Sequence, residues 1–171
     1  MPAVRLVLTT VVLLLAVVVQ VAVFSAFSVD GVVPNVVLLV VVAAGLVRGP
    51  EFAAALGFLG GLAVDIAPPA DHVAGRWALA LVVVGYLAGR VRQDTGTSPL
   101  GALVTVAACS FVGTSLYALS GMVLHDPAVP VADALRVIPV AVLYDVMVTP
   151  FVLPVLMKLF RRLRPAPRVA Y

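Results

Sequence analysis

Long apolar runs with almost no charged residues constrain this chain more than any other feature. The first run, Leu6–Phe27, has 22 residues and would reach about 33 Å as a helix, enough to cross a hydrocarbon core of about 30 Å. A cleaved signal peptide is the competing interpretation, but its apolar region is about 7 to 15 residues long. With 63% hydrophobic and 11% charged residues, the chain has too few polar side chains to surround a water-soluble core. We therefore predict an integral membrane protein.

Five further apolar runs follow, and the turns between them are too short to hold a soluble domain. We predict a single all-α transmembrane domain over residues 1–171 with six transmembrane helices and a basic tail at 161–171. The spans are expected at about residues 6–27, 32–47, 52–68, 73–89, 100–124 and 137–160. The fourth run is short for a span, so a re-entrant segment is the alternative interpretation of residues 73–89.

The basic residues decide between these alternatives. With six crossings and a cytoplasmic N-terminus, nine Arg and Lys residues lie inside and two outside, as the positive-inside rule requires. A re-entrant fourth run would place the C-terminal basic cluster outside. We therefore predict a multi-pass protein of the plasma membrane with both termini in the cytoplasm. The cluster, five of the eleven basic residues within the last fourteen positions, is expected to bind anionic headgroups rather than nucleic acid.

Small residues at helical spacing predict the faces on which helices meet. Helices in lipid lack a hydrophobic drive to associate, so close contact depends on small residues that let backbones approach. Ala53, Gly57 and Gly61 recur every four residues in the third run, and Gly85 and Gly89 form a GxxxG pair in the fourth. We expect these five positions to face protein rather than lipid.

A polar passage links the third and fourth runs. It contains Asp65, Asp71, His72, Arg76 and Trp77. One interpretation is an ordinary helix end at the membrane surface, and the other is a polar patch that fixes a loop for a partner or for helix packing. An Asp-His pair such as Asp71-His72 is weak evidence for a general base or a metal site.

Asp145 is the one ionisable residue well inside a predicted span. A carboxyl group at that depth is costly, so we expect it to be protonated, to face a polar interior, or to bond with Tyr144, Thr149 or backbone freed near Pro150. It is either a polar clamp between helices or a proton or substrate site. Gln20, the only strongly polar side chain of the first run, either bonds a neighbouring helix or contributes to such a site.

Motifs of enzyme chemistry are missing from the sequence. No nucleophile with a base, metal-ligand spacing or phosphate-binding glycine loop is present, and the single cysteine, Cys109, lies inside an apolar run. We therefore predict a non-enzymatic protein without a catalytic, cofactor-binding or metal site.

The order of several elements resembles the bacterial rod-shape-determining family MreD over nearly the full chain. The elements are Pro34-Asn35, the turn Arg48–Pro50, the glycine-rich run ending in Asp65, the passage PPADHVAGRWAL, and the last run with Tyr144-Asp145 and Pro150. Members of that family often carry Asn after the Tyr. The resemblance implies a structural component of the cell-wall elongation complex in the bacterial cell membrane. Its implied partners are the bitopic protein MreC and, directly or indirectly, the filament protein MreB and the peptidoglycan synthases, and a homodimer is among the expected assemblies.

The resemblance also implies a compact bundle similar to the substrate-binding subunits of energy-coupling-factor vitamin transporters. Such a subunit of a small-molecule transporter is therefore the alternative function, with Asp145, Gln20, Trp77 and Asp71 binding a solute. A transporter subunit predicts a polar pocket open to the outside, whereas a scaffold predicts an apolar cavity filled by lipid or by a partner helix.

Overall fold

The computed structural model of the chain is built of helices. It describes residues 2–28, 31–68, 73–95, 98–124 and 131–163. Within these ranges there are six α-helices, one short 3-10 helix and no strand, which confirms the predicted all-α class. The elements are α1 (Pro2–Ala22), η1 (Phe24–Phe27), α2 (Val36–Arg48), α3 (Pro50–Asp65), α4 (Arg76–Thr95), α5 (Pro99–Val123) and α6 (Val131–Arg162).

Three of the described helices are long and apolar enough to cross a membrane. They are α1 from Val4, the whole of α5, and α6 from Leu135. Large apolar side chains on all three are exposed, among them Leu14, Phe111 and Phe151. Such surfaces suit hydrocarbon rather than water, so these helices indicate a membrane protein.

Helix α2 forms the centre of the bundle. Every residue from Val36 to Val47 is buried, and the helix packs against each of the other five α-helices. Its 13 residues reach only about 20 Å, less than the thickness of a hydrocarbon core. A helix that is apolar on all sides is expected where protein surrounds it completely, and α2 is surrounded in this way.

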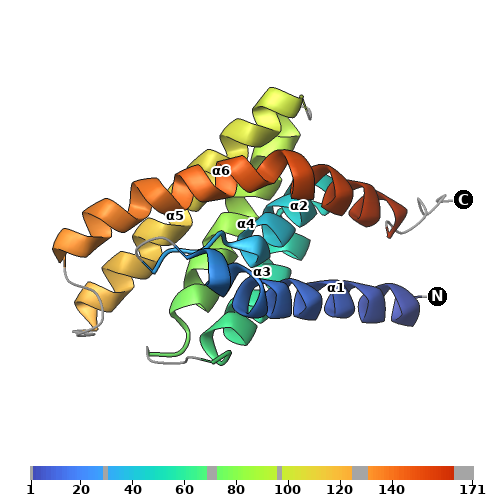
Figure 1. The fold of residues 1–171 in the computed structure, drawn as a ribbon. Coiled ribbons are helices and arrows are strands. Elements are labelled where there is room, and N and C mark those ends of the chain that lie inside the picture. The colour runs from blue at the N-terminus through green and yellow to red at the C-terminus, as the bar shows by residue number, and fades with distance from the viewer. Residues whose placement is uncertain (1, 29–30, 69–72, 96–97, 125–130, 164–171) are drawn as a thin grey trace, which may run out of the picture.

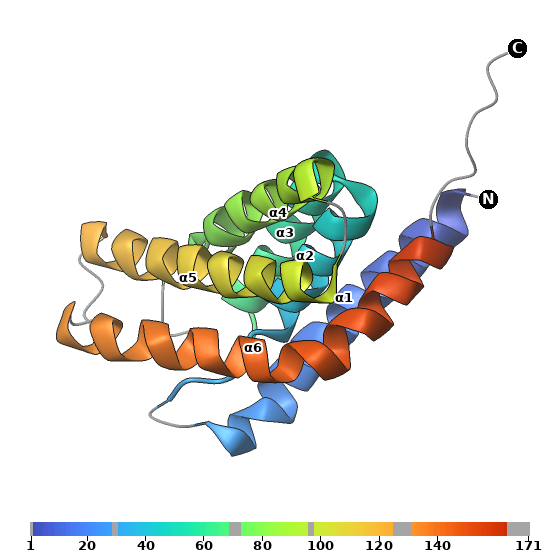
Figure 2. The same cartoon turned by 90° about the horizontal axis from the view of Figure 1, so that it is seen from above.

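The other helices are arranged around α2. The antiparallel pair α3 and α4 packs on it, and α1 lies against α2 and α3. Helix α6 runs beside α5 over its first half and then crosses α2 (Figures 1 and 2). Three prolines, Pro139, Pro150 and Pro154, lie inside α6, and each removes one backbone hydrogen bond from the helix.

The chain enters α2 differently from the expected span at 32–47. Helix α1 already ends at Ala22, η1 follows, and residues 31–35 are not helical although Val32, Pro34 and Asn35 are buried. Pro34 disfavours a helical conformation at Val33, and Asn35 is the N-cap of α2, so the helix begins at Val36. The start of α2 therefore lies inside the protein rather than at its surface.

Two further helices differ in length from the expected spans. Helix α4 begins at Arg76 and continues to Thr95, so its 20 residues reach about 30 Å. Helix α6 begins at Val131, six residues before the expected start of the last span. As a result Asp145 lies near the middle of α6.

Contacts near the two ends of the chain bring separate segments together. The start of α1 and the end of α6 lie at the same end of the bundle (Figures 1 and 2). The Nη1 atom of Arg48 donates to the carbonyl oxygen of Leu163 over 3.4 Å, and the guanidinium lies 3.9 Å from the centre of the Phe52 ring. Phe52 also meets Phe160 edge to face. These contacts join the α2–α3 turn to the end of α6.

Candidate functional site

Asp145 of α6 connects three helices through its side chain. The carboxyl group is buried, with only 1% of the residue exposed. Its Oδ1 accepts a hydrogen bond from the backbone N–H of Asn35 over 2.7 Å, and its Oδ2 accepts one from the Ser110 hydroxyl over 2.6 Å. The side chain thereby ties α6 to the start of α2 and to the middle of α5.

The first turn of α2 is closed by side chains from several parts of the chain. The first N–H groups of a helix have no partner within the helix. Here Oδ1 of Asn35 accepts from the N–H of Leu38 over 2.9 Å, and Oε1 of Gln20 accepts from the N–H of Val37 over 3.1 Å. Asp145 in turn accepts from the N–H of Asn35. Oxygen atoms of Gln20 from α1, of Asn35 and of Asp145 from α6 therefore meet at the start of α2, which is the positive end of its dipole. This cluster, Gln20, Asn35, Ser110 and Asp145, is called the α2 cap below.

The partners of Asp145 differ from those expected from the sequence. The expected partners were Tyr144, Thr149 or freed backbone near Pro150. The hydroxyl of Thr149 instead donates to the backbone carbonyl oxygen of Asp145 over 2.5 Å, one helical turn away, and Tyr144 lies half-buried on the same helix. The observed partners are Asn35 and Ser110. The sequence marks Asn35 only as part of the Pro34-Asn35 element of the family resemblance, and Ser110 only as a serine within an apolar run, so neither is predicted to bond with Asp145.

Asp65, at the end of α3, has an equivalent role at the start of α4. It is 1% exposed. Its Oδ2 accepts from the N–H groups of Gly75 and Ala78 over 2.8 and 3.1 Å, and its Oδ1 accepts from the N–H of Trp77 over 3.1 Å. The carboxylate of one helix thus caps the next, where a negative charge is favourable.

Arg76 and Trp77, which follow this cap, pack against α5. Arg76 is 2% exposed, its Nη2 donates to the carbonyl oxygen of Tyr117 over 2.8 Å, and its guanidinium lies 4.0 Å from the centre of the Tyr117 ring. The Trp77 ring stacks on the same tyrosine at 4.5 Å. Of the polar passage, Asp65, Arg76 and Trp77 therefore come together as a structural joint, while Asp71 and His72 lie outside the described residues.

Removing the Asp65 carboxylate is expected to destabilise the α3–α4 joint. Asp65→Ala leaves three N–H groups without their acceptor, and loss of a helix cap typically removes about 0.5 to 2 kcal/mol of stability. Thermal unfolding in detergent, followed by loss of the monodisperse peak, measures this. Glu51→Ala, which removes an exposed acid from the first turn of the same helix, is the control for loss of charge alone and should lose only about 0.3 to 1 kcal/mol. Equal stability of both variants would contradict the capping role.

The small residues of α3 and α4 lie between the two helices. A Cβ atom added at Gly57 would overlap the carbonyl oxygen of Leu81, and one at Gly61 would overlap the backbone of Ala78. On α4, Gly85 faces the carbonyl oxygen of Ala53, and Gly89 faces the backbone of Pro50. At all five positions singled out by their spacing, the backbones of α3 and α4 are thus in direct contact.

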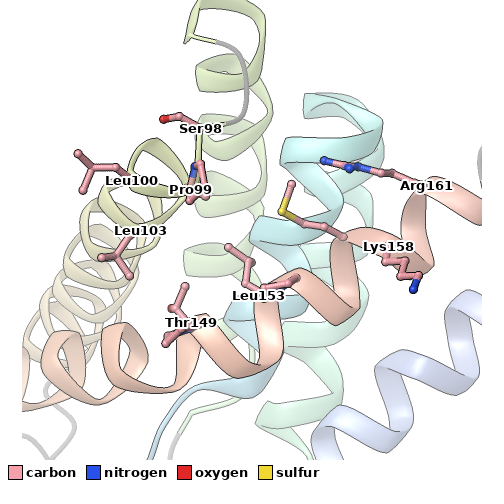
Figure 3. A pocket seen from close by; sticks show the side chains of 12 residues that line it. Ser98, Pro99, Leu100, Leu103, Thr149, Leu153, Lys158 and Arg161 are labelled. Carbon is pink, nitrogen blue, oxygen red and sulfur yellow. The ribbon is translucent and has the colours of Figure 1, made fainter.

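A groove opens between the start of α5 and the second half of α6. It encloses about 880 Å³, and its walls include Leu103, Leu153 and Met157 (Figure 3). The polar atoms of the α2 cap do not line it. Among the described residues no group of three or more His, Cys, Asp or Glu side chains could hold a metal ion.

Comparison of the chain with protein families, with curated proteins and with solved structures gives no match.

Proposed function

We propose that the chain is a non-enzymatic membrane component of the bacterial cell-wall elongation complex, of the MreD type. In this role it binds an MreC-like bitopic protein and links the MreB filament to the peptidoglycan synthases. The order of motifs along the sequence suggests this family. The observation that carries the choice between scaffold and transporter is the way in which the buried polar side chains are used.

Of the four candidate solute-binding residues, Asp145 and Gln20 have side-chain oxygen atoms that are bonded within the protein, to Asn35 and Ser110 and to Val37. The Trp77 ring stacks on Tyr117, and Asp71 lies outside the described residues. A solute site needs a few convergent polar groups that face a pocket. The groove at α5 and α6 has apolar walls instead, which is the property expected of a scaffold. These observations favour the scaffold over the transporter subunit.

We also propose six crossings with both termini in the cytoplasm, in a bundle like that of the vitamin-transporter subunits. The position of the start of α1 and the end of α6 at one end of the bundle supports an even number of crossings. The length of α4 supports a full span for the fourth run. The excess of basic residues assigns that end to the cytoplasm. The likeness to the transporter subunits depends on the family resemblance alone.

Purification from a rod-shaped bacterium tests the proposed function. We expect a tagged chain, extracted in mild detergent, to enrich an MreC-like bitopic protein and wall synthases at least about tenfold, because a ratio of ten corresponds to only about 1.4 kcal/mol of preferential binding. The control is an unrelated multi-pass protein expressed at the same level, and mass spectrometry identifies the partners. Enrichment of a transport ATPase without any wall protein would contradict the proposal and favour the vitamin-type transporter subunit.

A further inference from the structure

The groove between α5 and α6 has the length of one membrane leaflet. Its residues on α6 extend from Thr149 to Arg161, which corresponds to about 18 Å along a helix. One leaflet contributes half of a hydrocarbon core of about 30 Å. With Thr149 at the centre of the bilayer, the remaining few ångströms would place Arg161 at the depth of the lipid headgroups.

The lining of the groove stops at Thr149, one turn of α6 short of the α2 cap. One turn before Thr149, the carboxyl group of Asp145 is bonded to Ser110, so α5 and α6 are held together there. A transmembrane helix of a partner would need a path through the full thickness of the membrane. The groove therefore suits an acyl chain better than a spanning helix.

Positive charge is concentrated at the end of the groove that contains Lys158 and Arg161. Arg161 and Lys158, one helical turn apart on α6, both line the groove, and the ammonium group of Lys158 points away from Arg161 (Figure 3). Ser98 and Pro99, at the start of α5, form the opposite edge. Among the described residues that line the groove none is acidic. The partial positive charge of the α5 start adds to that of the two side chains.

We propose that this groove binds an anionic phospholipid, with an acyl chain between α5 and α6 and the phosphate beside Arg161. Basic pockets between helices on the cytoplasmic side are suited to anionic headgroups, and the apolar walls below Arg161 match the chain attached to such a headgroup. The proposal takes the cytoplasmic position of the end of α6 from the topology proposed above, but it does not depend on the role in the wall complex, because no protein partner takes part.

Native mass spectrometry of the full chain with phosphatidylglycerol tests whether the charge of Arg161 contributes to lipid binding. Since one basic residue near an anionic surface contributes about 1 kcal/mol, Arg161→Gln should weaken phosphatidylglycerol binding about fivefold. Arg162→Gln is the matched control, since Arg162 is the exposed next residue and does not line the groove. Arg162→Gln should weaken binding less than Arg161→Gln does, because Arg162 is not part of the groove that holds the phosphate, and phosphatidylcholine should bind all three proteins equally. Equal losses in the two variants would mean non-specific attraction and would overturn the proposal.

Filling the groove tests the acyl-chain site. Leu103→Trp places a larger side chain between the helices and should displace the bound phosphatidylglycerol, whereas Val104→Trp adds the same bulk on an exposed face of α5 outside the groove. The comparison requires that both variants unfold in detergent at the same temperature. If Leu103→Trp fails to fold, the smaller substitution Leu103→Phe takes its place. If phosphatidylglycerol stays bound in the filled variant, or if crosslinking through the groove captures a protein helix, the lipid proposal is wrong.

Discussion

Replacing Gly57 and Gly61 of α3 with Leu is expected to separate α3 from α4 and to abolish the monodisperse folded protein. Both positions face backbone atoms of α4, namely the Leu81 carbonyl oxygen and the Ala78 backbone. A neighbouring side chain can rotate away from added bulk, but a backbone cannot move without shifting the whole helix. Overpacking usually destabilises by about 1 to 3 kcal/mol per site, and two such sites on one face remove much of the stability of a small protein. Size-exclusion chromatography and thermal unfolding in detergent measure the loss.

The matched control for this double variant is Ala55→Leu. Ala55 lies on the same helix but is exposed, so a leucine there meets lipid or detergent rather than α4. We expect this variant to elute and unfold like the parent. If the Gly57→Leu/Gly61→Leu protein were as stable as Ala55→Leu, the close packing of α3 and α4 would be wrong.

The packing positions could be predicted from the sequence because their signal is local. A four-residue spacing places Ala53, Gly57 and Gly61 on one face of any helix, whatever its neighbours are. In lipid such a face has few roles other than contact with another helix. The same reasoning applied to Gly85 and Gly89 on the partner helix, so both sides of one interface were available before the fold was known.

The central position of α2 could not be predicted in this way. An entirely apolar helix satisfies a lipid environment and a protein interior equally well, because both lack water. The sequence of residues 32–47 therefore predicts an ordinary transmembrane span. Only the tertiary structure shows that its start is buried and has to be capped by other helices.

The caps illustrate the same limit for the polar residues. An N-cap normally comes from the residue beside the helix start, and Asn35 follows this rule. Asp145 and Gln20, by contrast, reach α2 from distant parts of the chain, and Asp65 reaches α4 across a ten-residue separation from Gly75. The cost of an acid inside a span indicated that Asp145 needs partners, but the partners themselves depend on how the helices meet.

Asp145→Leu is expected to destabilise the bundle strongly, whereas Asp145→Asn is expected to be tolerated. Leucine offers no acceptor, so the buried Asn35 N–H loses its partner, and the Ser110 hydroxyl is left with only a carbonyl oxygen of its own helix. An unsatisfied buried group costs about 1 to 3 kcal/mol, and we expect a loss of that size at the centre of the fold. Thermal unfolding in detergent and the yield of partner co-purification measure the two variants side by side.

Asparagine keeps both bonds because the two partners of Asp145 differ in kind. The Asn35 N–H can only donate, and the amide oxygen of asparagine accepts from it. The Ser110 hydroxyl both donates and accepts, so it can accept from the new amide N–H₂ and donate to a carbonyl oxygen of its own helix. Asp65 provides the contrast, because both of its oxygens accept from backbone N–H groups. Asp65→Asn should therefore lose at least one bond and unfold at a lower temperature than Asp145→Asn.

A scaffold requires only that the hydrogen bonds of residue 145 are kept. If Asp145→Asn kept its stability and its partners but failed to support cell-wall growth, an ionisable carboxyl group would be needed, and the transporter interpretation would gain over the scaffold.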